Sequence, residues 1–146
     1  MEEHLREQEQ IVCSTSGVSM WPMLRNRKDM IVVSAVQGDL KKRDVPLYRT
    51  PSGKLILHRI LAVKDDHYVI RGDNLLDKEH VPKKWVIGVL KAFYRNGKYY
   101  DCETNRIYHA YIRINQITFP IRYLWKRMIR PVLAKIKHVI MPHHTP

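Results

Sequence analysis

The stretch KWVIGVLKAFYRNGKYYDCE, residues 84–103, decides the fold class. It contains two runs rich in β-branched and aromatic residues, with the turn sequence RNGK (95–98) between them. Such runs favour strands, and Asn-Gly favours a short turn. The stretch therefore predicts two neighbouring strands.

Similar β-rich runs occupy much of the preceding chain. They are MIVVSAV (30–36), VPLYR (45–49), KLILHRILAV (54–63) and HYVIRG (67–72). Turn-forming segments such as QGDLKKRD (37–44) and TPSGK (50–54) separate them. We therefore expect residues 10–104 to form a mainly β domain, an antiparallel barrel or sandwich, after a polar lead-in at 1–9.

The last part of the chain, 105–146, is predicted to be a basic amphipathic helical tail. From Ile117 onward, apolar residues recur at steps of three and four, as on one face of a helix. Pro131 should kink or split this helix, and Pro142 should end it. The members of the apolar stripe are Ile121, Leu124, Trp125, Met128, Ile129, Val132, Leu133, Ile136, Val139 and Ile140.

Composition limits the other possibilities. The 146 residues suit one domain. Cys13 and Cys102 form no CxxC pair and no cluster with histidine, so we expect no disulfide framework, no metal and no cofactor. The charged opening MEEHLREQEQ is not a secretory signal, and no run is apolar enough to span a membrane, so the expected location is cytoplasmic.

The net charge of +12 is unevenly distributed. No acidic residue follows Glu103, whereas eight Lys and Arg residues do. The tail can therefore pack its stripe on the β domain, or bind an anionic membrane surface through residues 117–146, which would place the protein on the cytoplasmic face of the membrane. Nucleic-acid binding is not favoured, because no helix-turn-helix or zinc motif accompanies the charge.

Three polar residues stand where a catalytic group is possible. Ser19 lies in SGVSMWPML (16–24), His58 in the apolar run LILHRI, and Asp73 in IRGDN, with Asp77 four residues later. A serine needs a base to become a nucleophile, and an imidazole oriented by a carboxylate is such a base. Taken singly, such a serine is more often a turn or cap residue, such a histidine a core or surface group, and Gly-Asp-Asn an ordinary turn.

Together, GVSMWPML, DMIVV, KKRDVPLYR, LILHRI and IRGDN resemble the ordered boxes of the signal peptidase I family, whose wider clan includes LexA-type self-cleaving repressors. The resemblance covers about residues 14–98. It implies a β-rich serine peptidase with Ser19 as nucleophile. His58 replaces the lysine base of most bacterial members, as in the archaeal and endoplasmic-reticulum branch. The resemblance makes Asp73 or Asp77 the third catalytic residue and favours Asp73.

The sequence also differs from the family pattern. Gly17 stands where bacterial members often carry a serine that helps to bind the oxyanion, so backbone N–H groups would take that role. No N-terminal anchor is visible, which favours cleavage of a leader peptide or a dedicated protein over removal of secretory signals.

Other residues near the serine have expected roles too. Met20, Trp21, Pro22 and Met23, with Gly17, could line the peptide-binding surface, or the methionines and Trp21 could pack under the loop. Arg59 and Arg71 are expected to make solvated ion pairs with Asp65, Asp66 or Asp77. The alternative function is a non-catalytic β domain that binds a peptide or an anionic surface.

Overall fold

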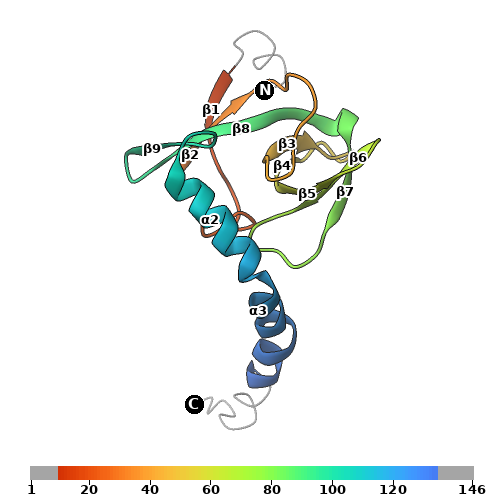
Figure 1. The fold of residues 1–146 in the computed structure, drawn as a ribbon, viewed down its shortest axis with the longest axis vertical. Coiled ribbons are helices and arrows are strands. Elements are labelled where there is room, and N and C mark those ends of the chain that lie inside the picture. Colours follow the sequence, from red (N-terminus) through yellow and green to blue (C-terminus); the bar gives the residue numbers. More distant parts are fainter. Residues whose placement is uncertain (1–9, 135–146) are drawn as a thin grey trace, which may run out of the picture. The chain divides into compact units, whose positions relative to one another are not determined.

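The protein is mainly β, as predicted, with two antiparallel sheets followed by helices (Figure 1). This computed structural model describes residues 10–134. The chain divides into two compact units, residues 1–112 and 113–146. The first unit holds both sheets and all the candidate site residues.

The larger sheet is built around one long strand, β8. Its strand order is β1-β2-β8-β3-β4, and β9 also pairs with β8. The predicted turn between β8 and β9 is present, with Asn96 and Gly97 at φ values of 52° and 74°. Its strands are β1 (Gln10–Ser14), β2 (Met30–Ser34), β3 (Pro46–Arg49), β4 (Leu55–Leu57), β8 (Val86–Arg95) and β9 (Lys98–Asp101).

The smaller sheet has the order β5-β6-β7. Its strands are β5 (Arg59–Val63), β6 (His67–Arg71) and β7 (Glu79–Pro82), and the 3-10 turn η1 (Lys83–Trp85) leads from β7 into β8. Within residues 10–134 the two sheets remain separate and do not close into a barrel.

The run KLILHRILAV is not one strand, although its alternation predicts one. β4 pairs with β3 in the larger sheet, whereas β5 pairs with β6 in the smaller sheet. His58 is the single residue between them. The chain therefore passes from one sheet to the other at the histidine, and this transition takes the His58 side chain out of a regular ladder.

Two buried clusters form the core of the first unit. One cluster joins the larger sheet to Tyr108 and Ile112, and it includes Met20, Met23 and Leu24 from the segment that carries Ser19. The other lies between the sheets and contains Tyr48, Ile60, Ile70 and Val89 among others. Burial of three apolar side chains therefore holds the serine segment against the sheet.

The C-terminal helices begin earlier than the apolar stripe predicted. They are α2 (Arg106–Ile117), α3 (Phe119–Leu124) and the π-helical turn η2 (Trp125–Ile129). The helical tail is expected from residue 105, but its apolar stripe is recognisable only from Ile117 onward. In α2 the stripe is obscured because only Tyr108 and Ile112 are deeply buried among its apolar residues, while Ile107 and Ile114 are exposed. No helix in residues 10–134 is long and apolar enough to cross a membrane.

Pro131 does not end the helical backbone. Residues 130–134 are helical, and the π-helical turn ends directly before them. A proline inside a helix removes one backbone donor, and a widened turn is one way to accommodate the unpaired carbonyl. The predicted stripe members Ile136, Val139 and Ile140, and the stop at Pro142, lie outside the described residues.

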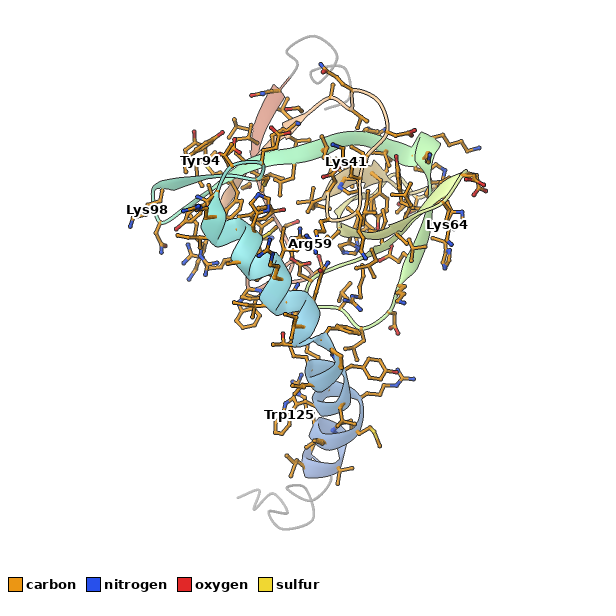
Figure 2. The ribbon with its side chains drawn as sticks, viewed as in Figure 1. Lys41, Arg59, Lys64, Tyr94, Lys98 and Trp125 are labelled. Carbon is orange, nitrogen blue, oxygen red and sulfur yellow. The ribbon has the colours of Figure 1, made fainter. Side chains whose placement is uncertain are left out.

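A buried ion pair joins β5 to the turn after β6. Arg59 Nε and Nη2 each donate to a carboxylate oxygen of Asp73, both at 2.8 Å, and Arg59 is only 1% exposed. Figure 2 shows Arg59 in the interior of the first unit. The expectation that Arg59 and Arg71 form solvated ion pairs is therefore wrong, because both residues are buried.

Two tyrosines of α2 form hydrogen bonds with the two members of this ion pair. Tyr108 Oη accepts a hydrogen bond from Arg59 Nη1 at 3.0 Å, and Tyr111 Oη donates to Asp73 at 2.9 Å. The carbonyl oxygen of Arg43 accepts a further bond from Arg59 Nη1 at 3.0 Å. A buried charge is tolerated when its hydrogen-bonding groups are satisfied, as they are here.

Replacing Asp73 by Asn should therefore destabilise the protein strongly. The neutral amide has nearly the same shape but leaves the Arg59 guanidinium buried without a counter-charge, which costs about 3–5 kcal/mol. Asp77→Asn is the matched control, because Asp77 is exposed and should change stability by about 0.5 kcal/mol or less. Urea unfolding followed by circular dichroism measures both. Equal stability of the two variants would contradict the role assigned to the ion pair.

Candidate active site

Ser19 lies in the loop between β1 and β2, at the edge of the core. Met20 and Met23 on its C-terminal side are buried, and the N–H of Leu24 donates to the carbonyl of Met20 at 3.0 Å, which closes a turn. Ser19 itself is half-buried, and Val18 before it is exposed. The serine is thus carried on an anchored turn while remaining accessible.

The Gly-Asp-Asn turn after β6 holds the backbone of Ser19. The N–H of Asn74 donates to the Ser19 carbonyl at 2.8 Å, and Asn74 Nδ2 donates to the Val18 carbonyl at 3.1 Å. A Cβ atom on Gly72 would lie only 2.8 Å from the Ser19 carbonyl oxygen, so glycine is required for this close approach. Two of the boxes that support the resemblance are therefore in direct contact.

His58 is oriented by a carboxylate and a phenol. Its Nδ1 lies 3.0 Å from Glu79 Oε1 and 3.3 Å from Tyr48 Oη, and Tyr48 donates to Glu79 Oε2 at 2.7 Å. A carboxylate beside Nδ1 favours the tautomer that carries its proton there. Nε2 then keeps its lone pair, and within residues 10–134 it has no hydrogen-bond partner.

Burial lowers the pKa of His58 below its ordinary value of 6.5. The imidazole is only 4% exposed, so the charged form is poorly solvated. The negative charges of Glu79 and Asp73 oppose this effect without reversing it. His58 is therefore neutral at pH 7, which is the form that can accept a proton.

The Tyr48 hydroxyl keeps its proton. Burial and the hydrogen bond to Glu79 both raise the pKa of this phenol. Tyr48 is therefore a permanent donor to Glu79, and it restrains the carboxylate that orients His58.

Neither Asp73 nor Asp77, the carboxylates that the sequence suggested, forms a hydrogen bond with His58. Asp73 is bonded to Arg59 and Tyr111, and its effect on His58 is through its charge, not through a hydrogen bond. Asp77 is exposed and makes no polar contact with residues 10–134. The carboxylate that contacts His58 is Glu79, which sequence reasoning missed.

A signal for Glu79 was nevertheless present in the sequence. The segment EHVP (79–82) forms β7, and its alternate residue Val81 is buried. Residues two apart on a strand share a face, so Glu79 points the same way as a core residue. An acidic residue on a buried face needs a partner, and that partner is His58.

The residues expected to bind substrate divide into two groups. Met20 and Met23 are buried in the core, so they fulfil the packing alternative. Trp21 is 53% exposed, Gly17 is exposed and Pro22 is half-buried. Leu75, also exposed, follows the Asn74 that bonds to Val18, so the accessible surface beside Ser19 includes several apolar side chains.

No hydrogen bond joins Ser19 to His58 in this structure. No hydrogen bond joins the Ser19 hydroxyl to any residue of 10–134, and His58 Nε2 is equally unoccupied. Catalytic contacts are often longer in the free enzyme and shorten when substrate binds. The structure thus contains a carboxylate–imidazole pair at His58 and, separately, a serine held through the Gly-Asp-Asn turn.

Across residues 10–134, no group of three or more His, Cys, Asp or Glu side chains is arranged to hold a metal ion. Both cysteines are free thiols, and burial raises the pKa of Cys102 to about 11, so it is a poor nucleophile at neutral pH.

Comparison with known proteins adds nothing to these observations. Neither a scan against known protein families nor a search of curated proteins found a match. The functional assignment therefore depends on the geometry around Ser19, His58 and Glu79.

The contact with Glu79 can be tested on His58 directly. The His58 imidazole should titrate below pH 6.5, and Glu79→Gln should lower its pKa further, because the charge that stabilises the imidazolium is removed. Titration of 15N-labelled histidine by NMR measures both values and also reports the tautomer. Asp77→Asn is the control and should leave His58 unchanged. An unaltered His58 titration in Glu79→Gln would show that the contact is absent in solution.

Proposed function

We propose that this protein is a serine peptidase in which Ser19 is the nucleophile, His58 the general base and Glu79 the residue that orients His58. The observation that supports it most is the 3.0 Å contact between His58 Nδ1 and Glu79 Oε1, with Nε2 left without a partner. The resemblance of the sequence boxes to the signal peptidase I family points to the same chemistry.

The first half of the reaction forms an acyl-enzyme. Ser19 Oγ attacks the carbonyl carbon of the scissile peptide bond while His58 Nε2 takes its proton. Negative charge then develops on the carbonyl oxygen. The N–H of Ser19 makes no hydrogen bond within residues 10–134, so it is available to stabilise this oxyanion.

The second half releases the products. The imidazolium of His58 gives its proton to the leaving amine, and the C–N bond breaks. Water then attacks the Ser19 ester while His58 accepts a proton from the water, and the acid product leaves as Ser19 recovers its proton. Throughout, Glu79 stabilises the positive charge on His58, and Tyr48 restrains Glu79.

The substrate in this proposal is an extended peptide segment, from a leader sequence or from one dedicated protein. The exposed side chains of Val18, Trp21 and Leu75 offer it an apolar surface near the serine. An extended peptide gains main-chain hydrogen bonds as well as contacts with alternate side chains.

A non-catalytic domain is the alternative. The observation that favours it is the lack of a hydrogen bond between Ser19 and His58 in this structure. Such a domain would bind peptides or anionic surfaces without cleaving them, and its function would tolerate loss of the Ser19 hydroxyl.

Ser19→Ala should abolish peptide cleavage without loss of stability, because Ser19 makes no side-chain hydrogen bond within the described residues. The assay incubates the full chain with a library of unstructured peptides, and mass spectrometry identifies cleaved bonds.

For wild type, kcat/KM should rise with pH to a plateau, with a midpoint below 6.5, because neutral His58 is the active form. Glu79→Gln should lower kcat by about 10²–10⁴-fold. Equal cleavage by Ser19→Ala would rule out this nucleophile.

We also propose that the tail places this peptidase on an anionic membrane surface. In α3 and η2, Ile121, Leu124, Trp125 and Met128 are exposed. Arg122, Lys126, Arg127 and Arg130 lie among them, and no acidic residue follows Glu103. Desolvation, Arg122 and Arg130 lower the pKa of Lys126, and anionic headgroups would relieve this crowding of like charges.

Vesicle co-sedimentation tests the membrane proposal. The full chain should bind vesicles of phosphatidylcholine with phosphatidylglycerol much better than vesicles of phosphatidylcholine alone. Charge reversal in Arg127→Glu/Arg130→Glu should weaken binding at least about tenfold, since each basic residue contributes about 1 kcal/mol near such a surface. The paired control is Arg27→Glu/Lys28→Glu, in the loop before β2. Undiminished binding after removal of residues 117–146 would contradict the proposal.

A further inference from the structure

Two histidines lie side by side on the smaller sheet, apart from the proposed catalytic residues. His67 begins β6, and His80 lies in β7. In the antiparallel register, Val69 pairs with His80 and His67 pairs with Pro82, so both histidines are on one face of the two strands. His67 Nε2 lies 3.1 Å from His80 Nδ1, and the ring centroids are 5.1 Å apart.

A carboxylate sets the tautomer of this pair. Asp66 Oδ1 lies 2.6 Å from His67 Nδ1, so this nitrogen carries a proton and donates it to Asp66. His67 Nε2 then holds a lone pair, which accepts the hydrogen bond from His80 Nδ1–H. One proton therefore lies between two nitrogens that can both act as metal ligands.

We propose that His67 and His80 bind one divalent transition-metal ion of the class that imidazole prefers, such as Cu²⁺ or Zn²⁺. With metal–nitrogen bonds of about 2.0–2.1 Å, a separation of 3.1 Å corresponds to an angle of roughly 95–100° at the metal. This value lies between square-planar and tetrahedral geometry. Metal binding requires His80 to change to the tautomer that is protonated on Nε2, which frees the lone pair of Nδ1. The two rings then turn so that both lone pairs face the ion, which lies beside the line between the two nitrogens.

The surroundings suit such an ion. Asp66 contacts His67 as the carboxylate behind a metal-bound histidine commonly does, and it fixes the ring orientation and the tautomer. The ammonium of Lys83, which begins the turn after β7, donates to Asp39 at 3.2 Å. His80 is exposed, so the ion can enter from solvent.

Two protein ligands make this an open site. No third His, Cys, Asp or Glu completes a metal-holding group among residues 10–134, so water fills the remaining positions. Affinity for a given nitrogen site rises along the first-row series to Cu²⁺, which makes Cu²⁺ the best probe.

The site does not depend on the proposed peptidase function. Glu79 and His80 are consecutive residues of β7, and their side chains point to opposite faces of the strand. Loss of metal binding in a His80 variant should therefore leave the contact between Glu79 and His58 in place, and the peptidase assay and the metal assay can fail separately.

The experiment is a Cu²⁺ titration of the full chain, followed by electron paramagnetic resonance. His4, His138, His143 and His144 are first replaced by Gln, so that histidines in the terminal segments do not compete. We expect one equivalent of Cu²⁺ with hyperfine structure from two nitrogens. His67→Gln and His80→Gln should each weaken binding at least about tenfold, and Asp66→Asn about tenfold through the ring that it orients.

His109→Gln is the matched control, because His109 is an exposed histidine outside the pair. It should bind Cu²⁺ as tightly as the background protein, and circular dichroism should show that every variant is folded. The proposal is overturned if the background protein takes up no stoichiometric Cu²⁺. It is equally overturned if His67→Gln and His80→Gln bind Cu²⁺ as well as His109→Gln does.

Discussion

The ion pair between Arg59 and Asp73 is the interaction on which the candidate site depends. Arg59 directly follows His58, and Asp73 lies between Gly72 and Asn74, which contact the backbone of Ser19. Two bonds of 2.8 Å therefore connect the first residue of β5, which directly follows His58, to the turn that holds the serine. Movement of either partner would displace a catalytic group, even though neither side chain takes part in the proposed chemistry.

This role explains why two charges are buried at such a position. Desolvation of each ion costs several kcal/mol, and apolar residues of similar size often give equal or greater stability. A paired guanidinium and carboxylate, however, permit only one relative geometry, because both bonds must be satisfied at once. The hydrogen bonds from Tyr111 and to Tyr108 extend this constraint to α2. The buried ion pair thus fixes the position of β5 relative to the turn after β6, at a cost in folding stability.

The sequence predicted the fold class correctly and supplied two of the three residues of the proposed site, Ser19 and His58, but not Glu79. Alternation of β-branched residues and the Asn-Gly turn report local structure, and both were interpreted correctly. Alternation could not show that KLILHRILAV changes sheets at His58, because both halves keep the same period. Nor could alternation show that Glu79, and not Asp73, contacts His58, because the partner of a carboxylate depends on contacts between distant segments of the chain.

The two carboxylates have different partners because their surroundings differ. Asp73 is almost fully buried, and only a permanent cation such as Arg59 can balance its charge there. Glu79 is partly exposed, so solvent as well as His58 and Tyr48 can contact its carboxylate. His58 needs a partner that stabilises its charge only when it is protonated, and a half-solvated carboxylate restrained by Tyr48 meets that need. The depth of burial therefore accounts for which carboxylate pairs with which side chain.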